Sequence, residues 1–137
     1  MAVIAVNPLV LKDVILTFGA NSYQKHVSGV VFTPKGSQIT FQGLTPDAKY
    51  TDVAAAEWTC ELSYVQDWET TNSLSAYLFA NEGATIAAVF KPRSGSGPTF
   101  TANLVISPGA IGGQVNSYAT TTVSLGCSGR PVLVPAV

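Results

Sequence analysis

The chain has 137 residues, of which 47% are hydrophobic and only 11% charged, and its net charge is −1. No apolar run approaches the ~18 residues of a membrane span, and the seven dispersed basic residues form no patch for nucleic acid. The length suffices for one domain with a core, but a small domain cannot hide so many apolar side chains inside itself. The composition therefore argues against a membrane or nucleic-acid-binding protein, and it predicts that other copies or partners cover part of the surface.

Short runs rich in β-branched and aromatic residues recur between clusters of Gly, Pro, Asn and Ser. The predicted strands cover residues 14–18, 26–33, 37–42, 57–66, 84–91, 99–106 and 118–125. This spacing is typical of antiparallel sheets. The expected fold class is therefore mainly β, an antiparallel sandwich or barrel formed by a single domain over residues 1–137.

The segments between these strands predict turns, loops and arms. Pro34-Lys35-Gly36 and the Gly/Ser-rich residues 92–98 each predict a hairpin link between two strands. Residues 43–56 show little periodicity and residues 107–117 are rich in Gly, so both are expected to be exposed loops. The apolar ends, residues 1–11 and 130–137, are expected to be extended arms that pack against another protein surface.

One segment between the strands has a helical period. Leu74, Tyr77 and Leu78 fall at i, i+3 and i+4 behind a capping cluster at residues 70–72. Gly83 stands where a left-handed residue would end a helix. We therefore expect one helix at about residues 71–82, flanking the sheet.

The alternation of apolar and polar residues predicts the core. The predicted core side chains are Trp58, Cys60, Leu62, Tyr64, Leu74, Tyr77, Leu78, Phe100 and Leu104. Cys60 and Cys127 are expected to be free thiols, because residues 1–11 lack the basic and small-residue features of a secretory signal. One disulfide between them is the alternative.

Catalytic and metal-binding patterns are weak. His26 is the single histidine and opens a predicted strand, so no second histidine exists to build a conventional zinc site. The glycine-rich stretches at residues 94–97 and 111–113 match no phosphate-binding loop. We expect a protein that is not an enzyme and uses no metal or cofactor.

The order of elements resembles that of the major tail tube proteins of long-tailed bacteriophages. The elements that carry the resemblance are the strand at residues 57–66, Asp67-Trp68, the helix at 74–80, Asn81-Glu82-Gly83, the strand ending in Phe90-Lys91-Pro92, the strands at 99–106 and 119–125 with the loop at 108–113 between them, and Gly129-Arg130-Pro131. The likeness covers most of the chain. It rests on order and spacing over many residues rather than on a short motif.

The resemblance implies the tail tube fold, a β-sandwich flanked by one helix. It also implies six copies in a ring, stacked rings whose lumen conducts DNA without specific binding, and tape measure, tail terminator and tip proteins as partners. The expected location is the virion tail, after assembly in the host bacterial cytoplasm. Two departures from larger members are the lack of a C-terminal immunoglobulin-like domain and a stacking loop at residues 43–56 that looks short.

In the family the inner barrel comes from two hairpins of each subunit, and their counterparts here are residues 26–42 and 84–106. The uncharged polar residues Gln38, Thr40, Thr101 and Asn103 are predicted to face the lumen, and the alternative is that they face solvent on an ordinary sandwich. The alternative function is a small immunoglobulin-like binding module or a capsid decoration protein. The mid-chain helix disfavours that alternative.

Overall fold

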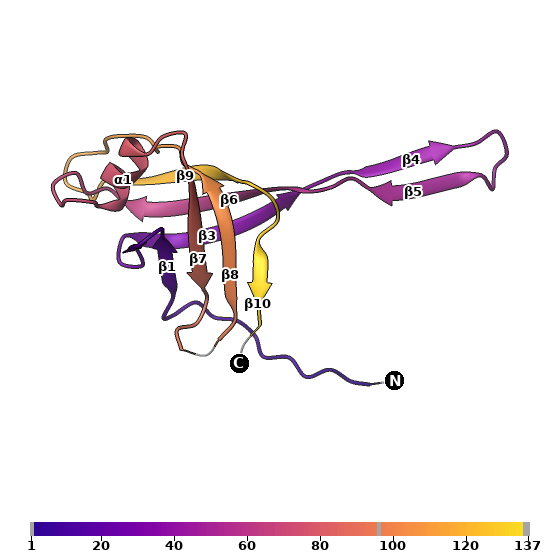
Figure 1. Ribbon diagram of the computed structural model, residues 1–137, viewed down its shortest axis with the longest axis horizontal. Coiled ribbons are helices and arrows are strands. Elements are labelled where there is room, and N and C mark those ends of the chain that lie inside the picture. The colour runs from indigo at the N-terminus through magenta and orange to yellow at the C-terminus, as the bar shows by residue number, and fades with distance from the viewer. Residues whose placement is uncertain (1, 96, 136–137) are drawn as a thin grey trace.

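The structure of the chain is a computed structural model that describes residues 2–95 and 97–135. Met1, Ser96, Ala136 and Val137, which fall in the predicted arms and the 92–98 turn, lie outside the described residues. The elements are β1 (Ile15–Phe18), β2 (Asn21–Ser22), β3 (Val27–Lys35), β4 (Gln38–Gln42), β5 (Lys49–Val53), β6 (Glu57–Val65), α1 (Leu74–Ala80), β7 (Thr85–Lys91), β8 (Thr99–Val105), β9 (Thr120–Cys127) and β10 (Val132–Val134). Figure 1 shows a body built of most of these strands and a long hairpin, β4 with β5, that projects from it.

The body is one antiparallel sheet folded over its own apolar face. Its strand order is β2-β1-β7-β8-β9-β6-β3, with β10 paired to β8. In Figure 1, β3, β6 and β9 run across the view while β7, β8 and β10 run nearly perpendicular to them, so the sheet makes two layers. The predicted class, a mainly antiparallel β-sandwich with one helix, is confirmed.

The seven predicted strands are all present, each with its ends within two residues of the prediction. Alternation explains this success: in β6, Cys60, Leu62 and Tyr64 are buried while Glu57 and Glu61 on the opposite side are exposed. Three short strands, β2, β5 and β10, were not predicted.

The hairpin prediction at Pro34-Lys35-Gly36 is wrong. β3 runs on into β4, and each strand pairs with the returning chain, β3 with β6 and β4 with β5. The ladder continues across the break, because the Ala54 N–H donates to the Ser37 carbonyl at 2.8 Å. A Cβ on Gly36 would lie 3.4 Å from both the Ala54 carbonyl oxygen and the Ala56 Cα, so this close cross-strand approach favours glycine. The Pro-Lys-Gly sequence thus lies at a short interruption between two strands of one long ribbon, and it forms no turn.

Two other loop predictions also need correction. Residues 43–56, expected as a short exposed loop, contain β5 and form the return half of the projecting hairpin. Residues 130–137, expected as an arm, contain β10, whose Leu133 pairs with Phe100 of β8. In contrast, the turn at 92–98 does join an antiparallel pair, β7 and β8, as predicted.

The helix is shorter than predicted and begins later. Its N-cap is Ser73, whose Oγ accepts a hydrogen bond from the Ala76 N–H at 3.4 Å, while Asn72 has a positive φ of 60°. The left-handed residue Gly83 (φ 84°) lies two positions beyond the C-cap, Asn81, and its N–H donates to the Ile106 carbonyl instead of to a helix carbonyl. The predicted helix is therefore present, but the predicted range was too long at both ends.

The core lies between the two sheet layers and beneath α1. Of the predicted core residues, Cys60, Leu62, Tyr64, Leu74, Leu78 and Leu104 are buried, whereas Trp58, Tyr77 and Phe100 are partly exposed. Tyr23 is also buried and fixes the helix, because its hydroxyl donates to the Asn72 carbonyl at 2.8 Å. Both cysteines are free, as expected, and burial raises the pKa of the Cys60 thiol to about 12, which makes it a poor nucleophile.

Candidate functional site

The outward face of the β7–β8 layer is uncharged at its mid-strand positions, and Lys91 lies at its edge, as the last residue of β7. Cross-strand register places Ala87 opposite Asn103 and Val89 opposite Thr101, and these side chains alternate with the inward-facing Leu104. The residues on this face are Thr85, Ala87, Val89, Thr101, Asn103 and Val105, together with Lys91 at the end of β7 and Thr99 at the start of β8. Mid-strand, this layer therefore presents small, polar or aliphatic groups and no ionisable group.

The outward face of the β3–β6–β9 layer is also poor in charge. The hydroxyls of Ser63 and Thr122 are hydrogen-bonded across the strands at 3.1 Å. Glu61 is the one charged residue in the middle of β6. Lys35 lies directly opposite Glu57 at the root of the hairpin, where their charges offset each other. Both layers thus expose surface that has little electrostatic attraction for a polyanion.

The four residues predicted to line a lumen are in two separate places. Thr101 and Asn103 lie on β8 in the body, and Asn103 is exposed. Gln38 and Thr40 lie on β4, in the projecting hairpin, opposite Val53 and Thr51. The premise that residues 26–42 form a hairpin of the sheet is wrong, so within one chain the four residues do not share a face.

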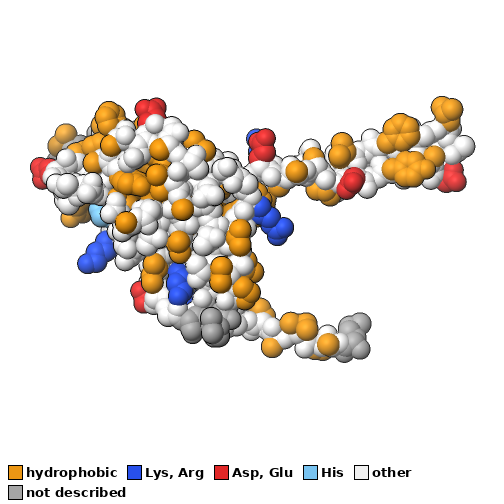
Figure 2. Space-filling model, in the orientation of Figure 1, with side chains coloured by type: hydrophobic (Ala, Val, Ile, Leu, Met, Phe, Trp, Pro, Cys, Tyr) orange, Lys and Arg blue, Asp and Glu red, His pale blue; other side chains and the backbone are white. Residues whose placement is uncertain are grey.

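The projecting hairpin carries an apolar face. Register puts Ile39, Phe41 and Tyr50 on the same side of the two-stranded ribbon, with Asp52 opposite Ile39 at the base of that side. The rings of Phe41 and Tyr50 stack with centroids 6.3 Å apart. We call Ile39, Phe41 and Tyr50 the hairpin face. All three are more than half exposed, and Figure 2 shows hydrophobic side chains along this projection.

Hydrogen bonds close the turn at the tip of the hairpin. The Gly43 N–H donates to the Ala48 carbonyl, and the Gln42 side-chain amide donates to the Thr45 carbonyl at 2.9 Å. A Cβ on Gly43 would lie 2.6 Å from the Ala48 Cβ, so a larger residue would force the turn open. An isolated two-stranded hairpin is marginally stable in water, so an exposed apolar ribbon of this kind indicates a surface that binds a partner.

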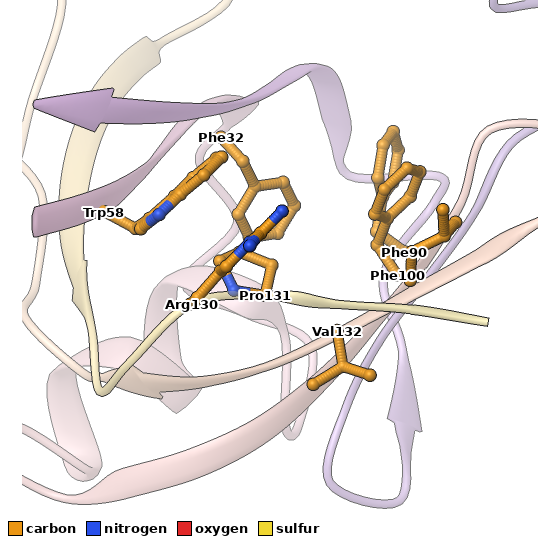
Figure 3. Close-up of a pocket in the computed structure, with 8 residues that line it drawn as sticks. Phe32, Trp58, Phe90, Phe100, Arg130, Pro131 and Val132 are labelled. Atoms are coloured by element: carbon orange, nitrogen blue, oxygen red, sulfur yellow. The ribbon is translucent and has the colours of Figure 1, made fainter. Parts of the chain in front are cut away.

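A third feature is an apolar groove where the two layers separate. β8 pairs with β9 only at Leu104 and Val105 and with β10 further along, which leaves a cavity of about 560 Å³ between β10 and the end of β6. Figure 3 shows its aromatic lining, with Arg130, Pro131 and Val132 along one wall. We call it the C-terminal groove, lined by Phe32, Trp58, Phe90, Phe100 and residues 130–133.

The groove explains why two predicted core residues are only partly buried. Trp58 and Phe100 do lie on the inward faces of β6 and β8, but the core is open at this end. Phe90 contacts both Phe32 and Phe100, with ring centroids 5.8 and 6.3 Å apart. Strand alternation predicts the side of the sheet on which a side chain lies, and it contains no information on whether a second layer covers that side.

The described residues bring no catalytic constellation together. His26 is half-buried with its ring edge against Tyr23 at 5.5 Å, and within residues 2–95 and 97–135 its Nδ1 has no hydrogen-bond partner. In the same part of the chain, no three His, Cys, Asp or Glu side chains lie together as metal ligands would. Hydrogen bonds from Thr70 and Glu69 lower the pKa of Asp67, which serves the turn before α1. Among the described helices, none is long and apolar enough to cross a membrane.

The fold and these surfaces define an antiparallel β-sandwich with one flanking helix and a projecting hairpin. No protein-family model and no curated protein matches the sequence. Among solved structures, the chain is similar to a chain in the cryo-EM structure of the anti-feeding prophage baseplate, which was symmetrised six-fold. The likeness has a TM-score of 0.56 at 15% identity and covers 96% of this chain and 98% of that one. The two chains therefore share a fold over nearly their whole lengths.

Proposed function

We propose that this protein is a structural subunit of a phage tail or a phage-tail-like particle, and that it forms the tail tube. Six copies close into a ring, rings stack into a tube, and the lumen conducts DNA. The observation that carries the proposal is the projecting hairpin, whose apolar face has no partner among the described residues of the chain. The shared fold with a chain of a six-fold symmetrised baseplate supports the same class of assembly.

In this proposal the hairpin joins successive rings. It extends away from the body, so its face can reach a neighbouring copy while the body forms the ring (Figure 1). The unpaired edge of β3, nine residues long, is a second surface that a neighbouring copy covers, because an open strand edge exposes unpaired N–H and C=O groups. A closed ring has no such edge.

Self-association tests the proposal directly. We expect purified protein to give hexamers or larger polymers by native mass spectrometry, and rings or tubes by negative-stain electron microscopy. An immunoglobulin-like module or a decoration protein would give neither rings nor tubes. A monomer at high protein concentration under all conditions tried would contradict the tube assignment.

The lumen wall in this proposal is the outward face of β7–β8. Duplex DNA carries one negative charge per ~1.7 Å of its axis, so cationic side chains repeated at every ring would hold the genome by phosphate contacts. The mid-strand positions of this face carry no charge, which suits a conduit that must release DNA. Thr101 and Asn103 contribute to that wall. Gln38 and Thr40 lie on the hairpin, away from this face of their own chain, and they line the lumen where the hairpin reaches a neighbouring ring.

Adding positive charge to this wall is expected to slow DNA ejection. Thr101→Lys or Asn103→Lys leaves the buried side of β8 unchanged, so assembly should persist while each ring gains six cations. Raised salt should relieve the delay because it screens phosphate contacts. The measurement is the ejection rate from particles, with Thr71→Lys, an exposed position in the turn before α1, as the control for added charge. Normal ejection from particles with Lys at 101 or 103 would exclude β8 as the channel wall.

A further inference from the structure

The N-terminal arm, residues 2–11, is an apolar segment whose residues are all exposed. Residues 2–11 contain no charged side chain, and Val3, Ile4 and Val6 are 95%, 84% and 82% exposed. Within the described residues, no backbone N–H or carbonyl of residues 2–11 makes a backbone hydrogen bond. A segment with these properties has neither a ladder nor a core of its own, so its ordering must come from another surface.

The base of the arm is fixed so that the rest points away from its own body. The Arg93 guanidinium donates to the Pro8 carbonyl at 3.0 Å, and the Ser94 N–H donates to the Asp13 carbonyl at 2.9 Å. Both contacts lie at the β7–β8 turn. Figure 1 shows the chain before this point extending outward past the C-terminal end.

The C-terminal groove has the complementary properties. Aromatic rings line it, and Arg130 is its one charged lining residue among those described. β10, at its wall, pairs with β8 on one side only, so its other edge keeps unpaired N–H and C=O groups. An extended apolar segment can therefore pair with β10 by backbone hydrogen bonds while its side chains fill the groove.

We propose that residues 2–7 of one copy bind the C-terminal groove of a second copy, as an added strand beside β10. This inference rests on the proposed self-assembly. Pro8 ends the added strand because it has no N–H to donate. The period of two places Ile4 and Val6 on one face, which enters the groove, and Val3 on the other.

The arm fits the groove better than the hairpin does. The hairpin is two strands wide, with strands ~4.8 Å apart and a stacked aromatic pair across them, whereas a cavity of about 560 Å³ with one open strand edge suits a single extended segment. Each copy carries one arm and one groove, so the contact is heterologous. Such a contact either closes a ring or propagates along a stack.

Photo-cross-linking tests this contact on the full-length protein. A benzophenone amino acid replaces Ile4 in one sample and Val3 in another, and equal amounts of ¹⁵N-labelled and unlabelled protein are mixed before assembly. We expect the label at position 4 to join peptides that contain Trp58, Phe100 or residues 130–133, in pairs of one heavy and one light chain. The label at position 3 should give several-fold fewer of these products. Pairs of matched isotope only, or attachment to residues 38–53, would overturn the proposal.

Charge substitution gives an independent measurement. Ile4→Asp should raise the protein concentration needed for assembly by about tenfold or more, since a buried Ile side chain contributes ~1.5–3 kcal/mol. Val3→Asp, at a position that is also highly exposed but lies on the other face, should change it less than about threefold. Equal effects of the two variants would overturn the proposed register. If the wild type assembles without groove cross-links, the arm proposal fails and the tube function stands; if the wild type stays monomeric, both fail.

Discussion

Truncation of Leu78 to Ala is expected to lower the free energy of unfolding by ~2–5 kcal/mol. Leu78 is fully buried on the inner face of α1, beside Leu74 in the same core. Its loss leaves a cavity under a helix of seven residues that is too short to be stable by itself. Chemical denaturation followed by tryptophan fluorescence and circular dichroism measures the change.

The neighbouring position provides the matched control. Phe79 is 57% exposed and contacts Trp68 edge-on, with ring centroids 6.1 Å apart. Phe79→Ala should therefore cost no more than about 1 kcal/mol. If Leu78→Ala cost no more than Phe79→Ala, the helix would bury a different face.

Substitution of Phe41 by Asp is expected to abolish assembly while the body stays folded. If the hairpin face packs against a neighbouring copy, the variant buries an unpaired carboxylate there, which costs several kcal/mol. The protein concentration needed for assembly should then rise by about two orders of magnitude or more. Phe41 lies on the projecting hairpin and outside the hydrophobic core, so the melting temperature should change little.

Thr40→Asp tests the same strand on its other face. Thr40 lies opposite Thr51, away from Phe41 and Tyr50, and it is equally accessible in the free chain. Tubes or rings should persist in this variant, as seen by electron microscopy and native mass spectrometry. Normal tubes from Phe41→Asp, or loss of tubes from both variants, would show that the hairpin face is not the contact surface.

The residues that sequence reasoning placed correctly are those with a strong local pattern. The alternation in β6 gave its inward face, and the i, i+3, i+4 spacing gave α1. The helix ends were less accurate because Ser73, rather than the cluster before it, accepts the first-turn N–H, and Asn72 takes a left-handed conformation. Capping depends on backbone angles that several adjacent polar residues can adopt.

The projecting hairpin and β10, unlike the N-terminal arm, were not visible in the local sequence pattern. Pro34 and Gly36 look like a turn, yet the ladder of β3 with β6 continues past them into β4 with β5. β10 is three residues long, and its pairing with β8 joins positions more than thirty residues apart. Neither short strands nor distant pairings leave a periodic trace in the sequence.

The sequence by itself determined the mainly β class, the seven principal strands, most of the core and the scarcity of charge, because each follows from residue type and short-range period. Only the tertiary structure decided that residues 38–53 project as a hairpin, that the two layers separate to leave the groove beside Trp58, and that the N-terminal arm points away from its own body. These features depend on which distant strands pair and on where pairing stops. That choice is made by the packing of the whole sheet around its core rather than by any one segment.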